Sequence, residues 1–161
     1  MKEIQLNIDV KVYAENELAP TDHRLVEMAK EVSAAAYAPY SGFHVGAAAL
    51  LADGTIVKGN NQENAAYPSG TCAERTAVFA ANALHPHTAV VAIAIAAADK
   101  SGFLDRPISP CGSCRQVLIE TEKRFGHDIR ILLYGTKETY ALGRAADLLP
   151  LCFDKDFLAN E

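Results

Sequence analysis

The first part of the chain alternates strictly between apolar and polar residues. Apolar side chains stand at every even position from Ile4 to Val12, and charged or amide side chains stand between them. A period of two is typical of a strand with one solvated face. The polar face suits the edge of a sheet or a subunit contact, so we expect residues 1–20 to form an N-terminal extension that contains an edge strand.

The pattern changes to helical spacing after Pro20. Thr21 or Asp22 can cap a helix there, and Pro39 stops it. Further on, Asp53-Gly54 is a pair that favours a tight hairpin turn. The other predicted elements are strands 44–51, 55–60, 88–97 and 129–134, helices 71–84 and 111–125, and a short helix 145–149. This order predicts an α/β fold in which helices cover a mixed sheet of about five strands, with the N-terminal strand added.

Composition and charge narrow the class of protein. The chain has 161 residues, half of them apolar, which suits one domain over residues 21–161. The net charge is −5 without any basic run, which argues against a nucleic-acid partner. The longest apolar run, 89–98, is too short to span a membrane, and the N-terminus lacks a signal-peptide core. We therefore expect a cytoplasmic protein whose four cysteines are thiols or metal ligands.

Three of these cysteines and a glutamate form the most informative cluster. Cys72 is followed two residues later by Glu74, and Cys111 and Cys114 lie about forty residues further on. Cys72 and Cys111 fall in the first turns of predicted helices, where the helix dipole favours a thiolate. The spacing predicts a zinc site with an open position, at which Glu74 serves as acid and base.

Three thiolates would leave the zinc site with a net negative charge of about one, which weakens the acidification of bound water. Arg75 and Arg115 follow the cysteines, and their guanidinium groups could withdraw charge from the sulfurs. We expect Arg75 to be the more important of the two. The alternative is that both are solvated charges on a helix surface.

Other readings of the cluster stay open on these residues alone. Thr71 and Glu74 match a capping box, in which the carboxylate serves the helix end instead of catalysis. The Cys111/Cys114 pair could be a redox motif. A closed structural zinc site would need Cys152 or a histidine as fourth ligand, although Cys152 between Leu151 and Phe153 suits simple packing.

Four segments stand in order along the chain: Pro39 to Ala48, Asn61 to Tyr67, Thr71 to Thr76 and Pro110 to Val117. Together they resemble the small homotetrameric cytidine deaminases. The resemblance implies a three-layer cytidine-deaminase fold with one zinc ion per subunit. It also implies hydrolytic deamination of cytidine and 2′-deoxycytidine to the uridines, with release of ammonia, in pyrimidine salvage. Active sites would lie near subunit interfaces of a homotetramer.

The resemblance also implies roles for individual residues. Three cysteines would hold zinc, and Glu74 would move protons between the zinc-bound water, ring N3 and the leaving ammonia. Phe43 would stack on the pyrimidine, while Asn61 and Glu63 would bind the ribose. The implied zinc ligands are Cys72, Cys111 and Cys114. Further implied contacts are backbone groups of Ala65 and Ser109, the side chain of Tyr67, and Phe153 reaching a neighbouring subunit's site.

Some features leave the substrate open. Gln62 stands where the family usually has an aliphatic residue, and an inward amide would need a partner. The same chemistry could act on a related aminated nucleoside, such as a nucleoside antibiotic. A structural-zinc or redox-thiol protein is the alternative of a different class.

Overall fold

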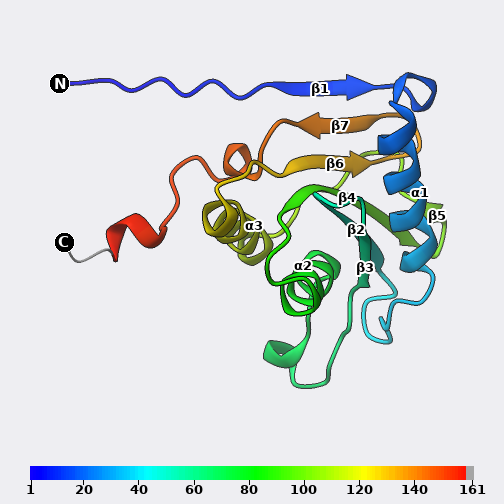
Figure 1. Ribbon diagram of the computed structural model, residues 1–161. Helices are drawn as coiled ribbons and strands as arrows, with labels where there is room; N and C mark the ends of the chain where they lie inside the picture. The colour runs from blue at the N-terminus through cyan, green and yellow to red at the C-terminus, as the bar shows by residue number, and fades with distance from the viewer. Residues whose placement is uncertain (159–161) are drawn as a thin grey trace.

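The computed structural model describes residues 1–158 and has one mixed sheet with helices on both faces (Figure 1). The strand order is β1-β7-β6-β4-β2-β3, and β5 pairs with β4. The β4–β6 pair is parallel and the other pairs are antiparallel. The strands are β1 (Val10–Tyr13), β2 (His44–Leu51), β3 (Ile56–Asn60), β4 (Val90–Asp99), β5 (Gly102–Phe103), β6 (Arg130–Tyr134) and β7 (Thr139–Leu142). The helices are α1 (Pro20–Ser33), α2 (Ala73–Leu84) and α3 (Gly112–Phe125), with short 3₁₀ turns at Glu15–Glu17, Tyr67–Ser69, Ala145–Leu148 and Lys155–Phe157.

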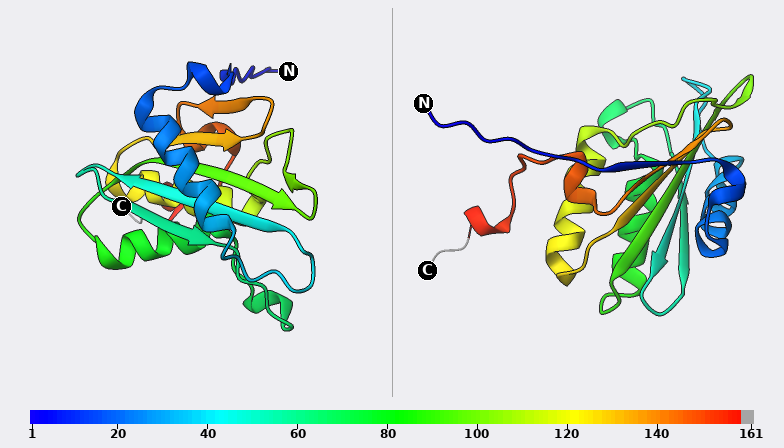
Figure 2. Two further views of the ribbon diagram at one scale, coloured as in Figure 1. Left: turned by 90° about the vertical axis from the view of Figure 1, so that its right-hand side faces the viewer. Right: turned by 90° about the horizontal axis from the view of Figure 1, so that it is seen from above.

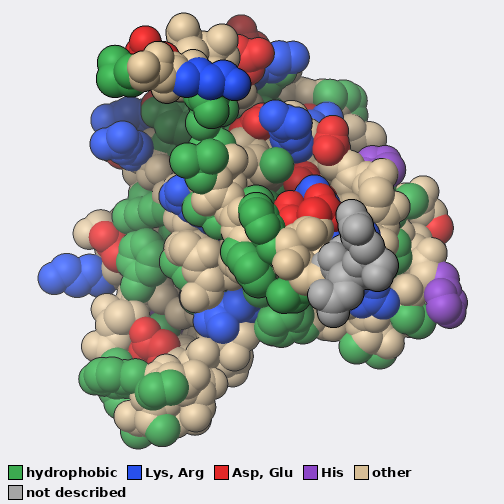
Figure 3. Space-filling view, turned by 90° about the vertical axis from the view of Figure 1, so that its left-hand side faces the viewer, with side chains coloured by type: hydrophobic (Ala, Val, Ile, Leu, Met, Phe, Trp, Pro, Cys, Tyr) green, Lys and Arg blue, Asp and Glu red, His purple; other side chains and the backbone are tan. Residues whose placement is uncertain are grey.

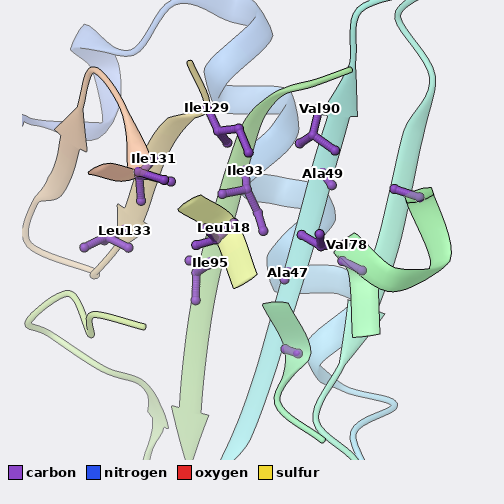
Figure 4. Close-up of a cluster of buried hydrophobic side chains, with 14 of the residues drawn as sticks. Ala47, Ala49, Val78, Val90, Ile93, Ile95, Leu118, Ile129, Ile131 and Leu133 are labelled. Atoms are coloured by element: carbon purple, nitrogen blue, oxygen red, sulfur yellow. The ribbon is translucent and has the colours of Figure 1, made fainter. Parts of the chain in front are cut away.

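Three layers result, with α1 on one face of the sheet and α2 and α3 on the other (Figure 2). Strand β4 is apolar along most of its length because both of its faces are buried. Ile93 and Ile95 point toward α2 and α3, where they pack among the buried side chains drawn in Figure 4. Ala92 and Ala94 point to the other face, toward α1. The predicted three-layer α/β fold is confirmed.

Glycine lets α2 approach the sheet closely. A Cβ atom on Gly59 of β3 would lie 2.4 Å from the backbone nitrogen of Ala77 and 2.8 Å from the carbonyl oxygen of Ala73. Atoms do not approach so closely, so the position accepts only hydrogen in the present arrangement. The depth of α2 against the sheet therefore depends on this residue.

The ends of several elements differ from the prediction. Strand β1 covers only Val10–Tyr13, although the alternating pattern begins at Ile4, because β7 offers four partners and then ends. Helix α1 starts with Pro20 at its first position and ends at Ser33. The predicted cap at Thr21 or Asp22 is wrong, since the Asp22 carboxylate instead pairs with Arg130 on β6.

Two strands were not predicted. β7 forms a hairpin with β6 across Gly135, and β5 is a two-residue extension that pairs with the end of β4. The expected short helix at 145–149 is a 3₁₀ turn over Ala145–Leu148. Across residues 1–158, none of the helices combines the length and the hydrophobicity needed to cross a bilayer.

Candidate metal centre and active site

Helices α2 and α3 begin at the same place and bring three cysteines together. Cys72 is the N-cap of α2 and Cys111 is the N-cap of α3, each with extended backbone and no side-chain cap. Cys114 lies buried one turn further along α3. The Sγ atom of Cys111 lies 3.8 Å from the Sγ atom of Cys72 and 3.5 Å from that of Cys114. All three sulfurs lie within 4.8 Å of one another.

These separations fit a zinc ion. Zn–S bonds of about 2.3 Å in a tetrahedron separate neighbouring sulfurs by about 3.8 Å. Three sulfurs supply three of four ligands, and no histidine or carboxylate within residues 1–158 joins the cluster as a fourth ligand. The donor set therefore suits zinc with one position left for another ligand.

The electrostatics favour a thiolate at Cys72. Hydrogen bonding with the Cys114 thiol, helped by Arg75 and Cys111, lowers the pKa of Cys72 to about 5. The hydrogen bond with Cys72 raises the pKa of Cys114, and burial and the nearby Glu74 carboxyl act in the same direction. Three sulfurs that lie this close together form an environment that a divalent ion stabilises.

Arg75 and Arg115 have different contacts. The Nη2 atom of Arg75 lies 3.6 Å from Cys72 Sγ, where it can draw charge from that ligand. The Arg115 guanidinium donates instead to the carbonyl oxygens of Pro110 and Leu148, at 2.8 and 2.9 Å, and to Ser109 Oγ. Arg115 thus fixes the backbone just before Cys111 and makes no recorded bond to sulfur among the described residues.

Glu74 is buried in the first turn of α2, with 5 % of its surface exposed. The helix begins at Ala73 with Cys72 as its N-cap, so Thr71 is not the cap and Glu74 does not stand at the third position that a capping box requires. The capping-box alternative is therefore wrong. Burial raises the pKa of Glu74, and the nearby Cys72 sulfur adds to this effect.

A cavity of about 460 Å³ opens beside these groups, within the usual size range of ligand sites. Phe43, Asn61 and Glu63 line it together with Cys72, Glu74 and Cys111. A neighbouring cavity of about 550 Å³ shares part of this lining and reaches Tyr67 and Arg75. The predicted base, sugar and metal contacts thus surround one space, although they come from the segment before β2, the segment after β3 and both helix N-termini.

Asn61 and Glu63 already make internal hydrogen bonds. Asn61 accepts from the backbone N–H of Val45 at 2.7 Å and donates to the carbonyl oxygen of Phe43 at 2.9 Å. Glu63 accepts from the N–H groups of Tyr40 and Ser41 at 2.9 and 3.2 Å, and from the Ser41 hydroxyl. These donors lower the pKa of Glu63, with the hydroxyl contributing most. An amide and a carboxylate keep further lone pairs and N–H groups for a ligand.

Ser41 is a site residue to which sequence reasoning gave no role. Its hydroxyl joins Glu63 to the N–H of Phe43, at 3.0 Å from that nitrogen, so one side chain positions both predicted ligand contacts. The signal was its place between Tyr40 and Phe43 in the motif.

Other predicted residues lie at varied distances from the cavities. Ser109 lines the smaller cavity, and exposed Tyr67 lines the larger one, where it meets Tyr40 edge-on. Among the described residues, Ala65 and Phe153 line neither cavity, and Phe153 is exposed and stacks on Phe157.

Two further residues settle questions raised by the sequence. The exposed Gln62 side chain donates to Asn60 Oδ1 at 2.6 Å, so its amide has a partner. Cys152 is partly buried and is absent from the three-sulfur cluster within residues 1–158.

The fold and the site define a class of protein. A buried carboxyl beside three convergent thiol ligands, at the mouth of a cavity, is the arrangement of a catalytic zinc site on an α/β scaffold and not of a closed structural one.

Comparison with known proteins gives the family. The sequence model of the cytidine and deoxycytidylate deaminase zinc-binding region matches residues 19–125. The chain is 39 % identical over 138 residues to a cytidine deaminase of Sporosarcina psychrophila, covering 84 % of this chain and 93 % of that protein. It is 40 % identical over 136 residues to one of Mycobacterium tuberculosis, covering 83 % and 90 %. The chain therefore belongs to the cytidine and deoxycytidylate deaminase family, whose members are zinc-dependent hydrolases.

Solved structures agree with this assignment. The crystal structure of a cytidine deaminase from Burkholderia pseudomallei is 40 % identical, with a TM-score of 0.70 over 81 % of this chain and 98 % of that one. The cytidine deaminase of Mycobacterium tuberculosis matches with a TM-score of 0.62 at 35 % identity, over 81 % and 94 %. Both alignments leave about a fifth of this chain unmatched.

Proposed function

We propose that this protein hydrolyses cytidine and 2′-deoxycytidine to uridine and 2′-deoxyuridine with release of ammonia. The observation that carries the proposal is the buried Glu74 carboxyl, which faces the same cavity as the cysteine cluster and the Phe43, Asn61 and Glu63 side chains. Relatives of similar length are named cytidine deaminases, which supports this substrate class.

In this proposal Cys72, Cys111 and Cys114 hold one zinc ion. Zinc bound there supplies a water acidified enough to act as a nucleophile at neutral pH. Arg75 limits the negative charge that three thiolates place on the site.

Glu74 holds and moves the proton. Its carboxylate takes one proton from the nucleophilic water and delivers it to pyrimidine N3. It then takes the second proton of that water, which is now on the C4 hydroxyl, and gives it to the departing amino group. A carboxyl whose pKa is raised by burial suits both directions of transfer near neutral pH. Protonation at N3 matters because attack at C4 would otherwise leave negative charge on the ring.

The remaining side chains orient the nucleoside. Phe43 offers an aromatic face to the base, and Asn61 and Glu63 bind the sugar hydroxyls with the hydrogen-bonding capacity that their internal contacts leave free. Ser109, which lines the smaller cavity, contributes backbone contacts to the base edge, and Tyr67 lies on the outer side.

The Glu74→Gln variant tests the proposal, because it keeps the shape of the side chain and removes the proton carrier. We expect zinc content to stay at one ion per chain while ammonia release falls by about 10²- to 10⁴-fold. Glu120→Gln, an exposed position on α3, is the matched control and should keep full activity. Full activity in Glu74→Gln would overturn the assignment.

A substrate panel separates the alternatives. Ammonia release is followed from cytidine, deoxycytidine, cytosine and deoxycytidine monophosphate. Turnover of both nucleosides supports the proposal, whereas turnover of the monophosphate alone would overturn the substrate assignment. If zinc is bound but none of the four compounds is turned over, the substrate assignment is wrong. The remaining explanations would be another aminated nucleoside as substrate or a structural role for the zinc.

We further propose a homotetramer in the cytoplasm, with Phe153 reaching the site of a neighbouring subunit. The exposed aromatic side chains of Tyr37, Phe79, Phe153 and Phe157 support burial between subunits. A reducing compartment keeps three thiols available for the metal. Sedimentation equilibrium gives the mass, and a Phe153→Ala variant that assembles normally but loses affinity for nucleoside would support the shared site.

A further inference from the structure

The N-terminal extension has an unused hydrogen-bonding edge. β1 is the end strand of the sheet and pairs with β7 only over Val10–Tyr13. Residues 2–9 continue the strand past the end of β7 and project from the domain (Figures 1 and 2). Within residues 1–158 these eight residues make no backbone hydrogen bond. A free strand edge is a template for pairing with another chain.

The same segment exposes one apolar face. Ile4, Leu6 and Ile8 are 78 %, 52 % and 42 % exposed, and Val10 and Val12 of β1 are also exposed. Leu6 and Ile8 stand across a cavity of about 530 Å³ from Ile119 of α3. Hydrophobic side chains are visible beside charged ones on this end of the molecule (Figure 3). The alternation of apolar and polar residues therefore begins at Ile4, before the stretch Val10–Tyr13 that pairs with β7. The apolar side chains before Val10 are left largely exposed.

The polar face of the segment is complementary to itself. When two copies of the strand run antiparallel with Asn7 opposite Asn7, Glu3 of each copy faces Lys11 of the other. Gln5 then faces Asp9, and the apolar positions meet in the pairs Ile4 with Val10 and Leu6 with Ile8. Neither Glu3 nor Lys11 takes part in an ion pair within residues 1–158.

Neighbouring registers lack this match. The pairing must change by two residues at a time to keep the apolar side chains on one face, which moves the central residue by one. Centring on Leu6 places Glu3 opposite Asp9, and centring on Asp9 places two Asp9 carboxylates together. Centring on Gln5 or Ile8 pairs no opposite charges. Among the five registers centred on residues 5 to 9, charge thus selects the one centred on Asn7.

We propose that the N-terminal strands of two copies of this chain pair antiparallel about a two-fold axis at Asn7. The two sheets then join edge to edge through residues 3–11, and the contact is the same on both copies. The family match begins at residue 19, so this interface is separate from whatever the catalytic domains form among themselves. It does not depend on the deaminase activity.

Disulfide trapping tests the axis. Opposite Cβ atoms in an antiparallel pair lie about 4.5–5.5 Å apart, close enough for a disulfide after a small adjustment. In a Cys152→Ser background, Asn7→Cys should form covalent dimers under mild oxidation. Gln5→Cys is the matched control, because its two copies would be separated by about four residues, or roughly 14 Å along the strands. Equal trapping of both variants, or trapping of neither, would overturn the proposal.

Charge exchange tests the register. Lys11→Glu places a carboxylate opposite Glu3 in each of the two pairs, and we expect the yield of the Asn7→Cys dimer to fall about tenfold. The double variant Glu3→Lys/Lys11→Glu restores opposite charges and should restore the yield. A double variant as impaired as the single one would show that Glu3 and Lys11 do not meet. Zinc content and ammonia release should stay unchanged in both, which separates failure of this interface from failure of the proposed activity.

Discussion

Replacing Gly59 with alanine should move the helix that carries Cys72 and Glu74. The added Cβ would lie 2.4 Å from Ala77 N, whereas ordinary contacts begin at 3.4 Å, so α2 must retreat by about 1 Å. Backbone atoms on both sides make a smaller adjustment impossible. Overpacking of this kind costs about 1–3 kcal/mol of folding free energy.

The retreat also disturbs the metal site. Cys72 moves with α2, whereas Cys111 and Cys114 belong to α3, and zinc–ligand distances tolerate changes of only about 0.2 Å. We expect zinc affinity to fall about 100-fold, as is typical when ligand positioning is lost. Competition with a chromophoric chelator measures the affinity, and urea unfolding measures the stability.

Gly143→Ala is the control, because a Cβ there meets no atom within 4 Å and the residue lies outside both site cavities among the described residues. It should leave zinc affinity and the unfolding midpoint unchanged. Zinc affinity and stability of Gly59→Ala equal to those of the unmodified protein would refute the inference that the close approach sets the ligand geometry.

Three further variants test other contacts. Ser41→Ala removes the hydroxyl shared by Glu63 and the backbone of Phe43. In steady-state assays KM for cytidine should rise about fivefold with little change in kcat. A fall in kcat alone would contradict this role. Arg75→Ala should lower kcat or zinc affinity about 10- to 100-fold, with partial recovery in Arg75→Lys, because Arg75 contacts the Cys72 sulfur. Equal activity in the unmodified protein and both variants would refute this role of Arg75. Glu122→Ala leaves three backbone N–H groups without their acceptor, two of them buried and one partly buried. It should lower the free energy of unfolding by about 3–5 kcal/mol, with a smaller loss in Glu122→Gln, as measured in urea.

The sequence was sufficient for the layers and for the metal cluster. Helix and strand periods place α2 and α3 correctly to within two residues, because each is long and has a strongly apolar face. Cys72 and Cys111 both stand at predicted helix starts, and the expectation that they share one metal site agrees with the sulfur cluster in the structure. β7 escaped prediction because four residues carry too little periodic signal, and its place is set by pairing with β6.

Long-range contacts account for the remaining differences. Asp22 is a good capping residue by type, but Arg130 lies within reach on β6 and Pro20 already begins the helix. Ser41 gained its role from Glu63, which lies 22 residues away in the chain. Local sequence preferences cannot reveal such partners, because Ser41 and Glu63 each look like an ordinary loop residue by themselves.

The position of the cysteines at two separate helix starts ties the metal to the folding of the whole domain. An ion held by Cys72 and Cys111 closes a loop of 39 residues that contains α2 and β4. For a covalent link, closing a loop of this length restricts the unfolded chain by about 4 kcal/mol. A chain depleted of zinc would therefore lose a clamp on its fold together with its chemistry.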